Sequence, residues 1–309
     1  MLRPPPSLAR PAPLRAGARV QLVAARSALG DGSKLEAGLT LLRQWGLEVE
    51  AEIQPLVERR WGYLAGRDHE RAADLAMTQG QPPAALHACV RGGWGAARLL
   101  ETPLELPNSW LLGFSDVTSL LLAQVARGQG GAIHGPLLTT LASEPLWSQE
   151  RLRSLLFGEP LSALQGEGWQ GGQAEGPLLV ANLTVATHLL GTPHLPPLAG
   201  AILILEDVGE APYRIERMLT HWRLCGALQG LAGIGFGSFE GCEEADSRAE
   251  EPEDRRFSLQ QVLQERTADL GIPVLGGLPV GHSPGNAALP LGIQARLDGH
   301  RGTLKLLSP

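Results

Sequence analysis

Cysteine and aromatic residues are scarce in this 309-residue chain. The three cysteines, Cys89, Cys225 and Cys242, lie far apart and show no metal-ligand spacing. They are too few for a disulfide framework, which favours a reducing compartment. Aromatic residues make up 5% of the chain against 43% hydrophobic residues. The composition therefore predicts a globular protein with an aliphatic core and no structural metal or disulfide scaffold.

Long apolar runs and excess positive charge are also missing. No segment approaches the roughly 20 apolar residues that span a bilayer. Residues 1–18 are rich in proline and arginine and lack the continuous apolar stretch of a signal peptide. The formal net charge of −6 argues against nucleic acid as the main partner, because phosphate binding needs a basic face. We expect a cytoplasmic protein with neither a membrane nor a nucleic acid as its partner.

The length and the order of apolar segments predict two domains. Residues 1–18 form a Pro-rich lead-in that we expect to be extended and poorly ordered. Short apolar strands alternate with helical patterns over 19–140, which is typical of parallel βαβ units. Residues 141–176, rich in Gly, Gln and Glu, are interpreted as the interdomain connection. Residues 177–309 would form a second domain with more strands, in which the acidic segment 240–253 is expected to be a mobile loop.

Several elements can be assigned individually. Ser33 is expected to cap a helix that runs to about Trp45. A strand is expected near 47–51, and a charged, alanine-rich surface helix over 67–78. In the second half the pattern predicts a helix near 181–190.

Three polar sites follow strands, and their order suggests a reaction. Ser115 follows the apolar run 110–112 after Gly113 and Phe114. Glu206 comes directly after the apolar run 201–205. His282 follows a glycine late in the chain. Strand ends present reactive groups to a cleft. Serine, carboxylate and histidine are the nucleophile, orienting acid and general base of acyl transfer, so the pattern favours an enzyme.

Each of these residues has a structural alternative. Ser115 could be a helix N-cap, and Val117 replaces the second glycine of a G-x-S-x-G elbow. Glu206 could be a solvated or capping residue, a role that Asp207 also fits. His134, before Gly135-Pro136, is a second histidine candidate. The glycine segment 91–95 lacks the glycine pattern of a dinucleotide-binding loop. Its glycines could form a structural tight turn, or they could let the backbone approach a ligand closely.

These sites and several further motifs resemble the LD-carboxypeptidase family of serine peptidases. That family includes muramoyltetrapeptide carboxypeptidases and relatives that confer immunity to microcin-type antibiotics. The resemblance runs from about Val20 to the C-terminus. The chain departs from the family pattern at 25–27 and at 179–181. The motifs that carry the resemblance are Tyr63-Leu64-Ala65-Gly66-Arg67-Asp68, Arg91-Gly92-Gly93-Trp94-Gly95, Gly113-Phe114-Ser115-Asp116, His134-Gly135-Pro136, Gly191-Thr192-Pro193, Leu205-Glu206-Asp207-Val208-Gly209-Glu210 and Gly281-His282.

The resemblance implies a fold and a reaction. The fold would be α/β, with a flavodoxin- or Rossmann-like parallel-sheet N-terminal domain and a β-rich C-terminal domain with helices. The reaction would be removal of the terminal D-alanine from murein tetrapeptides in peptidoglycan recycling, without metal or organic cofactor. Monomer and homodimer both remain open. Ser115, Glu206 and His282 would form the triad, backbone N–H groups of Gly93 and Asp116 the oxyanion hole, and Gly92, Trp94, Ser27 and Asn182 would contact substrate.

Three alternatives compete with this interpretation. The same chemistry could act on peptidyl- or aminoacyl-nucleotide antibiotics, which would need an aromatic platform for the base. A non-catalytic protein that binds a sugar or nucleotide would show no coupling between Ser115 and His282. A metal hydrolase is disfavoured because the histidines and acids lack ligand spacing.

Overall fold

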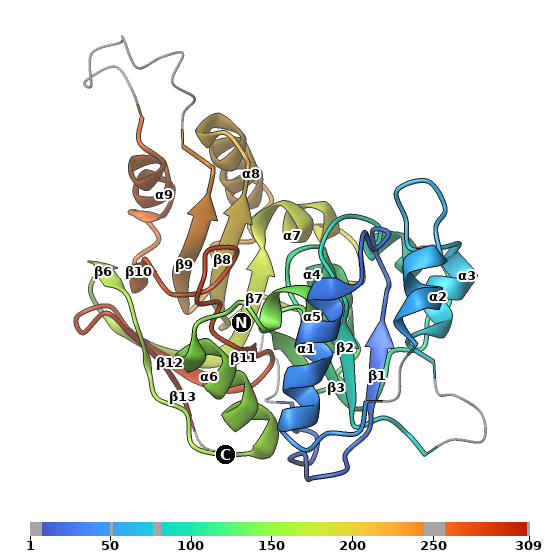
Figure 1. The fold of residues 1–309 in the computed structure, drawn as a ribbon. Helices are drawn as coiled ribbons and strands as arrows, with labels where there is room; N and C mark the ends of the chain where they lie inside the picture. Colours follow the sequence, from blue (N-terminus) through green and yellow to red (C-terminus); the bar gives the residue numbers. More distant parts are fainter. Residues whose placement is uncertain (1–7, 50–51, 77–81, 244–256, 308–309) are drawn as a thin grey trace.

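The computed structural model describes residues 8–49, 52–76, 82–243 and 257–307, and it contains two sheets (Figure 1). In the first sheet four short strands are parallel and β11 is antiparallel to β4. This arrangement confirms the predicted N-terminal parallel sheet. Its strands, in spatial order, are β1 (Val20–Val23), β2 (Leu86–Cys89), β3 (Trp110–Gly113), β4 (Ala132–His134) and β11 (Leu289–Pro290).

The second sheet is larger and mixed, which confirms the predicted β-rich C-terminal part. Strands β7 to β10 are parallel, and the strands at both edges are antiparallel to their neighbours. In spatial order the strands are β5 (Leu164–Gln165), β13 (Thr303–Leu306), β12 (Gln294–Asp298), β7 (Gln173–Asn182), β8 (Ile202–Val208), β9 (Gly233–Glu240), β10 (Val274–Gly276) and β6 (Glu167–Gln170).

The helices pack on the two sheets through their apolar faces. In α1, Leu35, Leu39 and Leu42 recur at helical spacing and are fully buried in the core of the first sheet. Helices α8 and α9 lie beside β8 and β9 in Figure 1. The helices are α1 (Ser33–Gln44), α2 (Ile53–Glu58), α3 (Asp68–Ala73), α4 (Thr118–Ala126), α5 (Leu138–Leu141), α6 (Leu146–Phe157), α7 (Leu183–Leu189), α8 (Pro212–Leu224) and α9 (Leu259–Thr267), with 3₁₀ turns η1 (Ala97–Glu101) and η2 (Ser115–Val117).

Helix α4 connects the two halves of the molecule. Its residues 118–125 are all buried, as expected for a helix that packs on every side. It contacts β4 of the first sheet and also β7 and α7 of the second half. The N–H of Asn182 donates to Thr118 Oγ1 at 3.0 Å. The start of α4, directly after Ser115, is therefore fixed against the end of β7.

Three local predictions need correction. Ser33 is the first helical residue of α1 and makes no side-chain cap; Asp31 Oδ1 instead accepts the Ser33 N–H at 2.8 Å. A carboxylate is favoured there because it also meets the positive end of the helix dipole. The helix predicted over 67–78 ends at Ala73, and residues 77–81 lie outside the described part. Near 47–51 the described residues form one isolated bridge, between Arg19 and Glu48, rather than a strand.

The lead-in is better ordered than the sequence predicts. Residues 1–7 are outside the described part, but Leu14 is buried and its N–H donates to Leu156 O at 2.8 Å. The proline-rich segment is held in place here because it packs on α6. The segment 141–176, predicted as a connection, holds α6, β5, β6 and the start of β7. Of the acidic segment 240–253, residues from 244 onward are not described.

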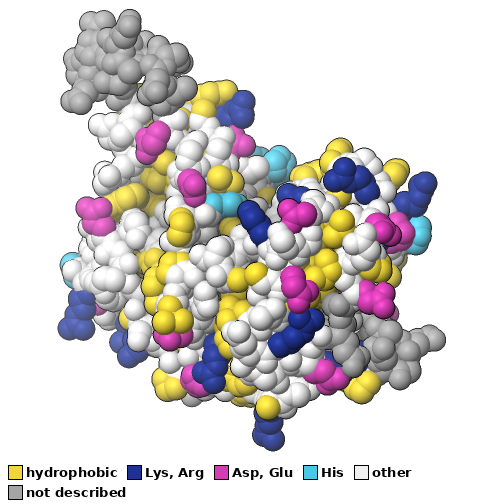
Figure 2. Space-filling model, viewed as in Figure 1, with side chains coloured by type: hydrophobic (Ala, Val, Ile, Leu, Met, Phe, Trp, Pro, Cys, Tyr) yellow, Lys and Arg dark blue, Asp and Glu magenta, His cyan; other side chains and the backbone are white. Residues whose placement is uncertain are grey.

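The surface carries mixed charge. On the face shown in Figure 2, acidic and basic side chains are interspersed, and no broad basic stripe is visible. Among the described residues no helix is long and apolar enough to cross a membrane.

Candidate active site

Ser115 lies in a sharp turn between β3 and η2. Its φ angle is 63°, the one left-handed non-glycine residue in the described part of the chain. Such a conformation costs about 1–2 kcal/mol and persists only where the surroundings enforce it. A side chain at Gly113 would meet Val117 Cγ2 at 2.7 Å, so glycine lets the turn close tightly. The turn presents the serine hydroxyl at the carboxyl end of the sheet.

The glycine loop after β2 lies next to this serine. A Cβ built on Gly92 would be 3.9 Å from Ser115 Oγ. Gly93 has φ 121°, and a Cβ there would meet Ser27 Oγ at 2.1 Å. The Ser27 hydroxyl accepts the N–H of Trp94 at 3.0 Å. The loop therefore needs glycine at 93 both for its backbone angle and for its close approach to Ser27.

Buried polar side chains hold the serine turn and the glycine loop together. Asp116 Oδ2 accepts the Ala96 N–H at 2.8 Å, and burial raises the pKa of Asp116 while Arg26 opposes the rise. Arg26 donates to the carbonyl of Phe114 at 2.9 Å, and Arg71 donates to the carbonyl of Gly95 at 2.8 Å. In the described part of the chain the N–H groups of Gly93 and Asp116 have no hydrogen-bond partner. Both remain free to bind a ligand oxygen.

Glu206 lies at an irregularity in the second sheet. The register between β8 and β9 shifts between Leu205 and Asp207, as in a β-bulge, which turns a side chain out of its regular direction. Glu206 is fully buried, and its Oε2 lies 2.6 Å from His282 Nδ1. Burial raises the pKa of Glu206, and the adjacent His282 works against that rise. A carboxylate–imidazole pair of this kind fixes one histidine tautomer and leaves Nε2 available as a base.

The loop that carries His282 is fixed by its neighbours. Gly281 has φ 125°, and a Cβ there would lie 2.9 Å from Glu206 Oε2, so a larger residue would displace the carboxylate. Asn286 Oδ1 accepts the Gly281 N–H at 3.0 Å. Glu144, just before α6, accepts the N–H of Gly285 at 2.8 Å.

Phe114 brings the serine and histidine together. It immediately precedes Ser115, and its ring contacts the His282 ring edge-on with centroids 4.8 Å apart. Among the described residues the Ser115 hydroxyl has no hydrogen bond to His282. Such bonds are often long before substrate binds. The three residues predicted from strand ends thus come from three separate segments and gather at one place.

His134, the second histidine candidate, lies behind Phe114. It is fully buried, and neither ring nitrogen has a hydrogen-bond partner among the described residues. Burial lowers the pKa of His134 to about 3, with His282 adding to the effect. A histidine that is inaccessible and neutral in this way is unsuited to exchange protons with substrate.

The four residues predicted to contact substrate occupy different environments. Gly92 and Ser27 border the serine turn, as described above, and Trp94 is half exposed beside them. Asn182 is buried. Its amide nitrogen donates to Asp207 Oδ1 at 3.0 Å and its oxygen accepts the Val185 N–H at 3.0 Å.

Sequence reasoning missed the supporting residues. Arg26 stands out in the sequence only as part of the segment 25–27 that departs from the family pattern, and Glu144 does not stand out at all, although each binds a loop that carries a site residue. Asp207, which fits a capping role in the sequence, accepts the Thr184 N–H at 2.9 Å and so binds the first turn of α7. The one sequence feature that could have indicated a supporting role is a charged residue within an apolar segment, as at Arg26.

A left-handed serine beside free backbone N–H donors, together with a buried Glu–His pair, is typical of one class of serine hydrolases. Comparison with known proteins agrees. Residues 20–135 match the LD-carboxypeptidase N-terminal domain, and residues 175–297 match the LD-carboxypeptidase C-terminal domain. The chain belongs to the LD-carboxypeptidase family and is a serine-type carboxypeptidase.

Individual relatives span nearly the whole chain. A putative carboxypeptidase of Synechocystis is 44% identical over 98% of this chain and 99% of its own. The murein tetrapeptide carboxypeptidase of Pseudomonas aeruginosa is 36% identical, and the match covers 92% of this chain and 94% of that protein. The crystal structure of muramoyltetrapeptide carboxypeptidase from Oxalobacter formigenes is 26% identical, with a TM-score of 0.79, and covers 93% of this chain and 97% of its own. The microcin C7 self-immunity protein MccF, 20% identical with a TM-score of 0.81 over 98% and 99%, shares the fold.

Alanine at Gly93 is expected to lower kcat by about 10²–10³-fold, the usual cost of losing one oxyanion donor. The added methyl group would collide with Ser27 and turn the N–H away. Gly128→Ala is the matched control, because Gly128 also has a positive φ but no atom of a described residue lies within 4 Å of the new Cβ. Thermal unfolding and kcat should be measured for both variants. Equal activity of the two variants would contradict a role for the Gly93 N–H.

Proposed function

We propose that the protein removes the terminal D-alanine from murein tetrapeptides with Ser115, His282 and Glu206 as its catalytic triad. The observation that carries this proposal is the left-handed Ser115 next to a His282–Glu206 pair 2.6 Å apart. The name of the Pseudomonas aeruginosa relative supports the choice of substrate. A place in peptidoglycan recycling, in the cytoplasm, follows from that substrate.

The first half of the reaction forms an acyl-enzyme. His282 Nε2 takes the proton of the Ser115 hydroxyl while Oγ attacks the carbonyl that precedes the terminal D-residue. The resulting oxyanion accepts hydrogen bonds from the N–H groups of Gly93 and Asp116. His282 then gives the proton to the amine of D-alanine, and the C–N bond breaks.

The second half regenerates the enzyme. Water donates a proton to His282 and attacks the ester carbonyl, and the C–O bond to Ser115 breaks as the serine regains its proton. Glu206 keeps His282 in one tautomer and stabilises the imidazolium that forms twice per cycle. Because Glu206 is fully buried, this stabilisation acts in a low dielectric, where it is strongest.

Substrate choice is expected to follow the configuration around the scissile bond. We expect removal of one D-alanine from a tetrapeptide with an L-configured centre before the bond, and at least 10²-fold lower kcat/KM for an all-L analogue. The wrong configuration would displace the carbonyl from Ser115, and a shift of about 1 Å can cost about 10²-fold. Mass spectrometry of both peptides and of an aminoacyl-adenylate analogue measures this preference.

The aminoacyl-adenylate analogue tests the main alternative, in which the protein hydrolyses peptidyl- or aminoacyl-nucleotide antibiotics. Faster cleavage of the aminoacyl-adenylate would assign the protein to self-immunity hydrolysis and contradict the cell-wall substrate. The triad would be unaffected by that result. Cleavage of no substrate would contradict the proposed function as a whole.

A further inference from the structure

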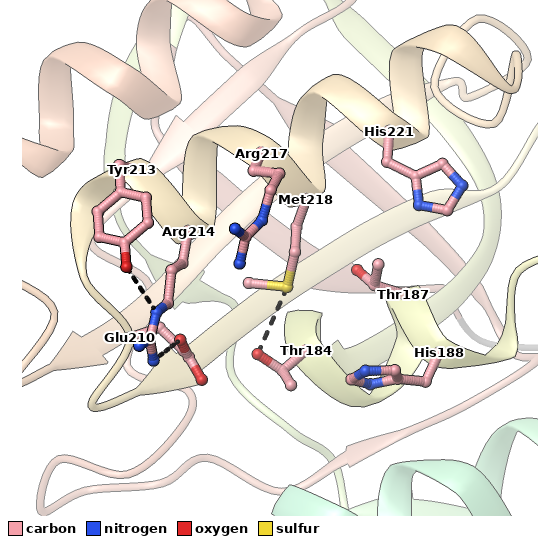
Figure 3. A pocket seen from close by; sticks show the side chains of 9 residues that line it. All are labelled: Thr184, Thr187, His188, Glu210, Tyr213, Arg214, Arg217, Met218 and His221. Carbon is pink, nitrogen blue, oxygen red and sulfur yellow. Dashed lines mark hydrogen bonds and ion pairs between the residues drawn. The ribbon is translucent and has the colours of Figure 1, made fainter.

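A pocket outside the triad lies between α7 and α8 (Figure 3). Its volume is about 610 Å³, within the range of ordinary ligand sites. Side chains of both helices point into it, and Met218 lies near its middle. The pocket is lined by Thr184, Thr187, His188, Glu210, Tyr213, Arg214, Arg217, Met218 and His221.

The wall of this pocket is joined to the catalytic residues. Thr184 donates to Asp207 Oδ2 from both its N–H and its hydroxyl, at 2.9 and 2.8 Å. Asp207 directly follows Glu206. Two residues before Thr184, the Asn182 N–H bonds Thr118 on the helix that follows Ser115. The start of the pocket therefore lies at the same carboxyl edge of β7 and β8 as Glu206.

Positive charge in the pocket exceeds negative charge. Arg214 is paired with Glu210, Nη1 to Oε2 at 3.3 Å, and its Nε donates to Tyr213 Oη at 3.1 Å. Arg217 has no ion pair or hydrogen bond to any described residue; its guanidinium lies 5.8 Å from the Tyr213 ring. Figure 3 shows it extending from α8 into the pocket, on the side that faces Thr184. The positive charge of Arg217, an exposed side chain, is thus available to a ligand.

The chemistry of that charge selects an anion. A guanidinium donates two parallel hydrogen bonds to a carboxylate or phosphate, and the geometry is more specific than that of a lysine. Stem peptides of the cell wall carry free carboxylates, so an anion-binding pocket at this edge of the sheet matches the proposed substrate class.

We propose that the α7–α8 pocket is a substrate subsite in which Arg217 binds a carboxylate of the peptide. This inference rests on the proposed function, because it takes the occupant to be part of the peptide that Ser115 cleaves. The role of Arg217 is binding and orientation, and the residue takes no part in proton transfer.

Calorimetry on the inactive Ser115→Ala protein tests the subsite without turnover. Adding Arg217→Gln should weaken binding of murein tetrapeptide by about 10- to 100-fold, the usual effect of one charge-assisted contact. Arg223→Gln is the matched control, since Arg223 lies on the same helix but pairs with Asp269 outside the pocket. It should leave the affinity unchanged. Tetrapeptides amidated at one carboxylate at a time identify the bound group, because one of them should bind weakly and be insensitive to Arg217→Gln.

Each outcome of this experiment is decisive. If Arg217→Gln binds every peptide as tightly as the control, the subsite is wrong, while release of D-alanine by the native enzyme would still uphold the proposed function. If affinity depends on Arg217 but the native enzyme releases no D-alanine, Arg217 still binds the peptide, but the proposed function fails and the pocket is not a subsite for that reaction. The same calorimetry is repeated with adenosine monophosphate. If Arg217→Gln weakens binding of adenosine monophosphate but leaves binding of the peptide unchanged, the pocket binds phosphate and the carboxylate proposal is wrong.

Discussion

Replacement of Ser115 by alanine is expected to reduce tetrapeptide cleavage by about 10⁶-fold, the scale on which loss of a serine nucleophile acts in a comparable triad. The loss follows because no other described hydroxyl occupies the left-handed turn at the end of β3. The fold should survive, since serine and alanine pay a similar cost at φ 63°. Steady-state cleavage and thermal unfolding of the variant measure the two effects separately.

Glycine at the same position is the informative control. Ser115→Gly should be as inactive as the alanine variant but more stable than the native protein by about 1 kcal/mol, because glycine adopts a positive φ without strain. Near-normal activity in either variant would show that Ser115 is not the nucleophile. Unfolding of both would show that the hydroxyl is structural.

Replacement of His282 by alanine is expected to cost nearly as much activity as loss of the serine, because Ser115 would then lack a base. Glu206→Gln should cost about 10⁴-fold, since the amide can hold the ring in the wrong tautomer. His282→Ala also leaves the buried Glu206 carboxylate without its partner, which destabilises the fold by about 1–3 kcal/mol. Activity and thermal unfolding should therefore be compared in each variant.

His282→Gln separates chemistry from folding. Its side-chain amide can donate to Glu206 but cannot act as a base, so the variant should be inactive and more stable than His282→Ala. The Ser115→Ala/His282→Ala double variant should be no less active than either single variant, because the residues act as one unit. Losses that add across the double variant would contradict a shared catalytic role.

The sequence was sufficient to predict the strands next to Ser115 and Glu206, whereas His282 lies in the loop between β10 and β11 and not at a strand end. Short apolar runs before Ser115 and Glu206 predicted β3 and β8, and parallel strands present their carboxyl ends at one edge. Such local patterns are set by residues close in the chain. The α/β class and the β-rich second half follow from the same patterns.

The remaining features depend on contacts between distant segments. Arg26 is buried because it bonds the carbonyl of Phe114, 88 residues away, and nothing near Arg26 in the sequence encodes that partner. The segment 141–176 contains α6 because Ser148 and Arg151 bond carbonyls of the His282 loop and β11 region. Composition indicated a connection between domains there but did not predict α6, β5 or β6.

The most direct test of the account is acid-quenched mapping of the acyl-enzyme. Native protein is mixed with murein tetrapeptide, stopped in acid within one turnover, digested, and examined by mass spectrometry, while free D-alanine is measured in the same sample. The account predicts that the peptide containing Ser115 carries the tripeptide acyl group and that D-alanine appears in equal amount. Release of D-alanine with the acyl group on another residue, or undiminished release by the Ser115→Ala protein, would contradict it.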